Sequence, residues 1–235
     1  MKIDLHVHTN FSWDGFSSPK EVVDTAIEKG VDCICIVDHN EIKGAIEAMK
    51  YGFDKNILVI PGIEILSMEG DILGINVKKI IPDFLAPEET IQEIKKQGGM
   101  AVIPHPFWPL SNLKNNREAL LSADAIEVLN ADMFRFINKK ALLFSKKYNL
   151  AFTAGSDAHR AKFIGRAYLE IPQNNLSEKE VIEQIKNKAG QIKGGELGFL
   201  ERIENSLKLT PKKIFQYYYE LGLKKKQFQK ERGLK

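Results

Sequence analysis

Ile3-Asp4-Leu5-His6-Val7-His8 is a short strand-like run that ends in two histidines, and it sets the architecture expected of the rest of the chain. Residues two apart in a strand point to the same face, so both imidazoles can bind one metal ion. The same spacing recurs in Gly155-Ser156-Asp157-Ala158-His159, which follows the apolar run at residues 150–153. Imidazole and carboxylate are the ligands of catalytic zinc, manganese and iron sites. The two runs therefore predict a metal centre at the ends of strands.

The other two histidines lie in Asp38-His39 and His105-Pro106, and each of these motifs also follows an apolar, strand-like run. Asp14 and Glu64 supply further carboxylates in similar positions. A single histidine is often only a buried core residue. Five groups of histidines and carboxylates at consecutive strand ends instead favour a metal centre with several ions.

Strand-like and helical segments alternate along the chain, which predicts a parallel sheet that is either open or closed into a barrel. In such folds ligands bind at the carboxyl ends of the strands. Pro61-Gly62 is expected to break the chain between two strands, and Ser18 and Ser177 to begin helices. The strands are expected at residues 3–7, 33–37, 57–60, 71–77, 100–103, 125–129, 150–153 and 168–171, and helices at 19–29, 42–51, 87–97 and 177–188.

The composition is that of a soluble globular protein, with 43% hydrophobic and 28% charged residues in 235. This length accommodates one α/β barrel or two small domains. No apolar run reaches the about 18 residues of a membrane span, and Met1 to His6 does not resemble a signal peptide, so we expect a cytoplasmic protein. Cys33 and Cys35 share one strand-like run and are expected to be buried thiols, with zinc binding as the alternative.

The last part of the chain differs in charge from the rest. Residues 201–235 carry ten Lys or Arg against four Asp or Glu. A basic tail can attract phosphate-bearing partners, and a solvated terminal helix can have the same composition. We expect a linker at the glycine-rich residues 191–198 and a helix that begins at Thr210-Pro211 and ends near residue 221. The expected domains are a barrel at 1–190 and a linker with a basic helical extension at 191–235.

The ordered set of motifs resembles the PHP (polymerase and histidinol phosphatase) superfamily over roughly residues 1–190. The set comprises His6/His8, Asp14-Gly15, Asp38-His39, Gly62-Ile63-Glu64, His105-Pro106 and Gly155 to His159. The resemblance implies a distorted, TIM-like (β/α)7 barrel of seven strands and seven helices. It also implies two or three divalent metal ions, which can be manganese, zinc or iron.

The resemblance further implies which residues hold the metals. His6, His8, Glu64 and Asp157 would hold one ion, and Asp14, His39 and His159 a second. Glu64 would bridge to a third ion completed by His105. Many relatives carry a histidine where this chain has Asp71, in Asp71-Ile72-Leu73-Gly74, and an aspartate there can still be a metal ligand.

This ligand set supports phosphoester hydrolysis by a metal-activated hydroxide. His159 or Asp38 could protonate the leaving group, although we favour Asp38 as a residue that orients a ligand histidine. Arg160, Arg135 and Arg166 are candidates for phosphate binding. Asn130 is expected to line the substrate pocket because its strand resembles a family element.

The resemblance favours a phosphatase acting on a small phosphorylated metabolite or nucleotide, of the nucleoside monophosphate or 3',5'-bisphosphate type. A histidinol phosphatase and a 5'-3' oligonucleotide exonuclease are the enzymatic alternatives. A nucleic-acid-binding scaffold on the same barrel is the alternative from another class. Trp13, Phe107 and Trp108 flank the ligand motifs and could either stack on a base or form the walls of the pocket.

Overall fold

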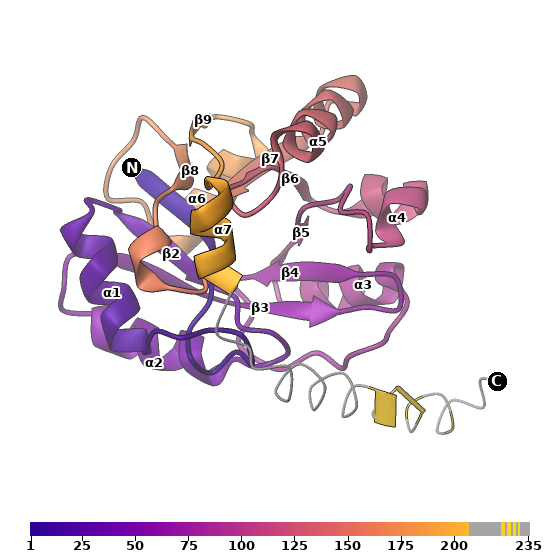
Figure 1. Cartoon of the computed structure of the whole chain (residues 1–235), viewed down its shortest axis with the longest axis horizontal. Helices are drawn as coiled ribbons and strands as arrows, with labels where there is room; N and C mark the ends of the chain where they lie inside the picture. Colours follow the sequence, from indigo (N-terminus) through magenta and orange to yellow (C-terminus); the bar gives the residue numbers. More distant parts are fainter. Residues whose placement is uncertain (207–221, 224, 227, 229, 231–235) are drawn as a thin grey trace.

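The computed structural model describes residues 1–206, 222–223, 225–226, 228 and 230. One sheet of nine strands lies inside, and the helices lie around it (Figure 1). The strands are β1 (Lys2–Val7), β2 (Cys33–Ile36), β3 (Leu58–Leu66), β4 (Asp71–Ile75), β5 (Met100–Ile103), β6 (Ala125–Asn130), β7 (Ala151–Gly155), β8 (Ala167–Glu170) and β9 (Gln191–Gly194). The helices are α1 (Pro19–Glu28), α2 (Lys43–Gly52), α3 (Pro87–Lys96), α4 (Arg117–Ser122), α5 (Arg135–Tyr148), α6 (Glu178–Lys186) and α7 (Phe199–Ser206).

The sheet closes almost completely into a barrel where β1 meets the segment after β7. The backbone N–H of His8 donates to the carbonyl of Ala158 at 3.0 Å, and Val7 and Ala158 form a parallel bridge. Gly155 permits this approach, because a Cβ atom there would lie only 2.3 Å from the Cβ of His6. The α/β barrel expected from the sequence is confirmed.

The expected parallel sheet is only partly right. β1, β2 and β3 are parallel neighbours, and so are β5, β6 and β7. β4 is antiparallel to both β3 and β5, and β8 is antiparallel to β1 and β9. β8 and β9 extend the sheet beyond β1, so the described residues contain nine strands rather than the seven implied by the resemblance.

We expected Pro61-Gly62 to break the chain between two strands, but this was wrong. Both residues lie inside β3. Pro61 pairs with Ile36 at the end of β2. A Cβ atom at Gly62 would lie 2.8 Å from the sulfur of Cys35 and 2.9 Å from the carbonyl oxygen of Gly74. Gly62 is therefore a point of close approach between three strands, which explains a glycine in a strand interior.

Helix starts and the buried cysteines agree with the expectations. Ser18 accepts a hydrogen bond from the N–H of Glu21 at the start of α1, and Ser177 forms a capping box with Glu180 at the start of α6. Cys33 and Cys35 are free thiols that are fully buried in the core.

The residues after 190 form more structure than the expected linker. Gln191–Gly194 is β9, paired with β8, and it is followed by α7. The expected helix at residues 211–221 lies outside the described residues. Among the helices that the structure describes, none has the length and apolar character needed to cross a membrane.

Candidate metal centre

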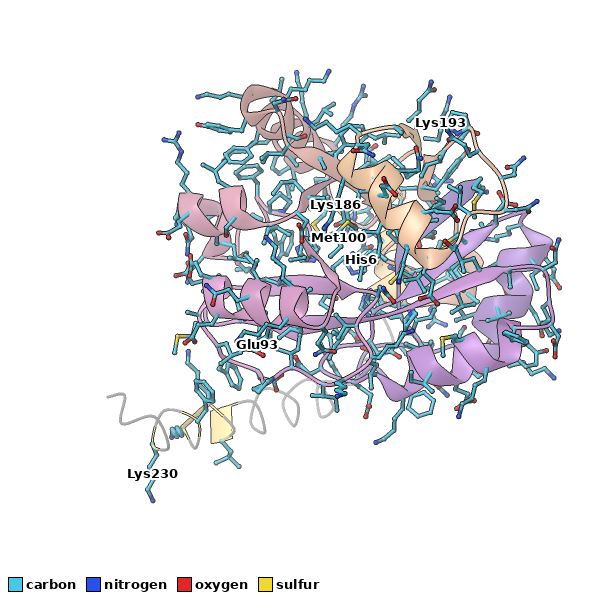
Figure 2. The ribbon with its side chains drawn as sticks, turned by 180° about the vertical axis from the view of Figure 1, so that it is seen from behind. His6, Glu93, Met100, Lys186, Lys193 and Lys230 are labelled. Carbon is cyan, nitrogen blue, oxygen red and sulfur yellow. The ribbon has the colours of Figure 1, made fainter. Side chains whose placement is uncertain are left out.

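The nine side chains predicted as metal ligands converge at one end of the barrel. They form four overlapping groups, and the ligand atoms within each group lie within 4.8 Å of one another. His6 lies deep inside the molecule, beneath the ribbon of the barrel (Figure 2). The groups are His8/Asp14/His39/His159, His6/Glu64/His105, His6/His8/Asp157 and His39/Glu64/Asp71.

The first metal position lies between two carboxylates and two histidines, His6 in β1 and His8 directly after it. The His6 Nε2 atom lies 3.3 Å from Glu64 Oε2 and 3.4 Å from Asp157 Oδ1. The His8 Nε2 atom lies 3.3 Å from each of the same two oxygens. Atoms that bind one ion tetrahedrally at about 2.1 Å lie about 3.4 Å from one another. The four side chains therefore fit a four-coordinate metal ion.

The second metal position surrounds one oxygen of Asp14, in the loop after β1. The Asp14 Oδ2 atom lies 3.0 Å from His159 Nε2 and 3.3 Å from His39 Nε2. The ring of His8 stacks on both imidazoles, with centroids 4.5 Å from His159 and 5.0 Å from His39. His8 therefore belongs to this group as well as to the first.

The third position differs from the expected arrangement. We expected Asp71 and His105 to complete one site together with Glu64. The structure groups His105 with Glu64 and His6, whereas it groups Asp71 with Glu64 and His39. The His105 Nε2 atom lies 3.5 Å from Glu64 Oε1. Glu64 is the shared carboxylate, as expected, but Asp71 and His105 fall into two different groups.

Two of the expected ligands have an uncommon backbone conformation. Asp157 has a φ angle of 52° and His105 one of 29°, in the left-handed region that residues with a side chain seldom occupy. Such a conformation persists only where the surrounding structure holds it, and it concentrates at functional sites.

Glu127, on β6, is a functional residue that the sequence reasoning missed. Its Oε1 atom lies 3.0 Å from His6 Nδ1, while its Oε2 atom accepts hydrogen bonds from the His105 N–H at 3.0 Å and the Asn130 amide at 2.9 Å. The Asn130 amide also donates to Asp157 Oδ2 at 3.0 Å. Asn130, expected to line the substrate pocket, is wholly buried and donates to the expected ligand Asp157. The sequence did offer one signal for this role, since Glu127 is the lone carboxylate within the apolar run 125–129.

Burial and neighbouring charges shift the pKa values of the clustered side chains, and for Glu64 they act in opposite directions. Burial raises the pKa of Glu64, but the positive charges of protonated His39 and His6 outweigh it and hold this pKa well below its usual range. Burial lowers the pKa of His8 to about 4, and the nearby His159 adds to this effect. Ionised carboxylates and neutral imidazoles are the forms that bind metal ions. Glu64 and His8 are therefore held in these forms at neutral pH. Burial lowers the pKa values of His105 and His159, but the Glu64 and Asp14 carboxylates outweigh it and raise both to about 9, so these two imidazoles would lose a proton on binding an ion.

The carboxylate of Asp38 bonds to Thr9 and not to a ligand histidine in the described residues. It is wholly buried, and its Oδ1 and Oδ2 atoms accept hydrogen bonds from the N–H and the hydroxyl of Thr9, both at 2.6 Å. Burial raises the pKa of Asp38 to about 6, although the two Thr9 hydrogen bonds oppose the shift. Asp38 anchors the turn after β1 rather than orienting a ligand histidine.

Two of the three candidate phosphate-binding arginines contact the C-terminal segment. The Arg160 Nε donates to the carbonyl of Glu204 at 2.8 Å. Arg166 donates to the carbonyl of Glu196 at 3.1 Å and to the carboxylate of Glu201 at 3.3 Å. Both guanidinium groups therefore help to hold residues 196–204 against the barrel.

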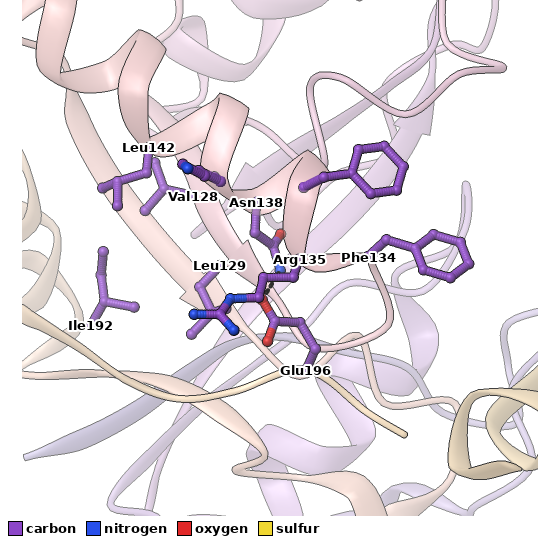
Figure 3. A pocket seen from close by; sticks show the side chains of 10 residues that line it. Val128, Leu129, Phe134, Arg135, Asn138, Leu142, Ile192 and Glu196 are labelled. Atoms are coloured by element: carbon purple, nitrogen blue, oxygen red, sulfur yellow. Dashed lines mark hydrogen bonds between the residues drawn. The ribbon is translucent and has the colours of Figure 1, made fainter. Parts of the chain in front are cut away.

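Arg135 lines a separate pocket of about 810 Å³ beside α5 (Figure 3). The residues around it include Val128, Leu142 and Ile192, so its walls are largely apolar. None of the nine expected ligands is among the lining residues. The structure therefore places Arg135 at a different pocket from the metal centre.

Comparisons with known proteins agree with this geometry. A family model described as PHP-associated matches residues 137–189. An uncharacterized protein of Methanocaldococcus jannaschii is 31% identical over 95% of this chain and 92% of its own length. A probable phosphatase of Caldicellulosiruptor bescii is 28% identical over 77% of this chain and 88% of its own length.

A solved structure with a similar fold is a two-domain protein of Bacteroides vulgatus that contains a predicted PHP-like metal-dependent phosphoesterase. It superposes with a TM-score of 0.69 at 22% identity, over 88% of this chain and 69% of that one. The nearly closed barrel agrees with the fold of this neighbour. The chain belongs to the PHP superfamily of metal-dependent phosphoesterases.

Proposed function

We propose that this protein hydrolyses a phosphomonoester of a small metabolite or nucleotide, of the nucleoside monophosphate or 3',5'-bisphosphate type. The observation that carries the proposal is the spacing of four buried ligand atoms. The Nε2 atoms of His6 and His8 lie 3.3–3.4 Å from the same oxygens of Glu64 and Asp157. A second group around Asp14 shares His8 with the first, so two ions could lie close together.

The residues of this chain would hold two or three divalent ions, and manganese, zinc and iron all suit such ligands. When bound, closely spaced ions lower the pKa of water and neutralise the oxygens of a phosphoryl group. Glu127 and Asn130 would keep His6 and Asp157 in position during turnover. Preorganised ligands of this kind lower the cost of reaching the transition state.

The surroundings of the centre favour a small substrate with an aromatic part. His39, His159 and His105 keep side-chain exposures of 15%, 14% and 11%, so among the described residues these three ligands form the accessible side of the centre. The Trp13 ring lies 6.1 Å from the ring of His39 and could stack on a base. Phe107 packs edge-on against Phe144 instead and forms part of the wall.

The proposal is tested by hydrolysis assays on metal-stripped protein reloaded with manganese, zinc or iron. The substrates would be p-nitrophenyl phosphate, AMP, a 3',5'-bisphosphate, histidinol phosphate and a short oligonucleotide. We expect phosphate release from AMP or the bisphosphate that EDTA abolishes. Preference for histidinol phosphate or the oligonucleotide would replace our substrate with one of the two enzymatic alternatives. Failure of the protein to bind any of the three metals would contradict the proposal as a whole.

A further inference from the structure

The segment after β9 runs back to the loops that carry the metal centre. Leu197 is buried, and its N–H donates to the carbonyl of Ala131 at 2.7 Å. The guanidinium of Arg202 donates to the carbonyls of Asp132 at 2.5 Å and Met133 at 2.8 Å. These bonds fasten α7 to the loop that follows β6, so its position relative to the barrel is defined.

Asn205, in the last turn of α7, contacts two expected ligands at once. Its side chain is wholly buried. The Oδ1 atom accepts a hydrogen bond from the backbone N–H of His159 at 3.0 Å, and the Nδ2 atom donates to the backbone carbonyl of Asp157 at 2.9 Å. One amide group therefore spans the Asp157-Ala158-His159 turn and pairs with one donor and one acceptor of its backbone.

The same turn needs support from outside. Asp157 has a φ of 52°, in the left-handed region that residues with a side chain occupy only when the surrounding structure holds them there. The carbonyl of Asp157 also lies 3.0 Å from His159 Nδ1, while His159 Nε2 faces Asp14 at 3.0 Å. When a carbonyl accepts from one ring nitrogen, the other is left to bind the metal. The Asp157 carbonyl held by Asn205 therefore sets the orientation of the His159 ring.

We infer that Asn205 is a positioning residue of the metal centre, through which α7 holds Asp157 and His159 in their metal-binding geometry. The residue lies beyond position 190, outside the part of the chain that carries the family motifs. The centre therefore depends on a segment that those motifs do not include. The effect on hydrolysis rests on the proposed function, whereas the effect on metal binding does not.

The test compares full-length Asn205→Ala and Asn205→Leu with wild type. Leucine is larger than asparagine and a better helix former, and it removes both hydrogen bonds without leaving a cavity, so it addresses the case in which the alanine variant fails to fold. Leu200→Ala, on the same helix, is the matched control, because Leu200 is 76% exposed. Metal-stripped proteins are titrated with cobalt(II), whose visible absorption reports both affinity and coordination geometry.

We expect both Asn205 variants to bind cobalt about 10–100-fold more weakly at one of the positions, as is typical for residues that support a ligand. The cobalt spectrum should change, and hydrolysis should return when metal is added in proportionate excess. Leu200→Ala should behave as wild type in each measurement. Cobalt affinity and spectra equal to wild type in a folded Asn205 variant would overturn the inference. Normal cobalt binding by wild type without hydrolysis of any phosphoester would instead contradict the proposed function alone.

Discussion

The Nδ1 atom of His6 lies 3.0 Å from Oε1 of Glu127, and both side chains are buried in the barrel interior. A carboxylate that accepts from Nδ1 sets the tautomer of the imidazole and leaves Nε2 for the metal. Nε2 is the atom that faces Glu64 and Asp157. Glu127 is therefore placed to orient the expected ligand His6.

Glu127→Gln should lower metal affinity about 10–100-fold while the fold is retained. An amide has only one acceptor oxygen, whereas Glu127 uses both of its oxygens. Oε1 faces His6 Nδ1, and Oε2 accepts from the His105 N–H and the Asn130 amide. Calorimetric titration of the stripped protein with zinc measures the change. Glu118→Gln, at an exposed position on α4, is the control. A zinc affinity of Glu127→Gln equal to that of the wild type would contradict the role of Glu127 in orienting His6.

His8→Ala should abolish hydrolysis, because His8 contributes to both the first and the second groups. Asp157→Ala should have the same effect, since its Oδ1 atom faces both His6 and His8. Circular dichroism would establish that the variants remain folded, with Lys193→Ala at the surface as a control. Full activity in either folded variant would reject the site.

Asp71→Ala and His105→Ala should weaken different metal positions. Asp71 groups with His39 and Glu64, whereas His105 groups with His6 and Glu64. Each variant should therefore show a lower metal stoichiometry by elemental analysis, and the double variant should lose more than either single one. Unchanged stoichiometry and affinity in Asp71→Ala would show that Asp71 is no ligand.

Gly155→Ala should destabilise the protein by about 1–3 kcal/mol, the usual cost of forcing an added methyl into a packed interior. The added Cβ would lie 2.3 Å from the Cβ of His6, so β7 and β1 would have to separate. Chemical denaturation measures the loss of unfolding free energy. Gly195→Ala is the matched control, since a Cβ atom there meets nothing within 4 Å. Equal losses in the two variants would contradict the close approach.

The thiols of Cys33 and Cys35 should react with a thiol-specific disulfide reagent only after unfolding. Burial raises the pKa of both thiols, and the reactive form of cysteine is the thiolate. At pH 8 the folded protein should therefore react far more slowly than protein in denaturant, where both thiols are exposed. Rapid modification of one thiol in the folded protein would contradict its burial.

The sequence by itself determined the class of fold, the helix starts at Ser18 and Ser177, and the convergence of nine side chains. These features follow from local rules: apolar periodicity places strands, capping residues begin helices, and parallel strands bring their carboxyl ends to one edge. The sequence did not reveal that Pro61 and Gly62 continue β3, because a break and a close approach of strands both select glycine.

Only the tertiary structure decided which residues support the ligands and which cations are already engaged. Glu127 and Asn205 act through hydrogen bonds to partners 121 and 46 residues away, and no local pattern encodes such a pairing. Arg160 and Arg166, which suit phosphate by chemistry, bind the C-terminal segment, and Asp38 binds Thr9. Residue type limits what a side chain can bind, but the packing of the chain decides which partner it meets.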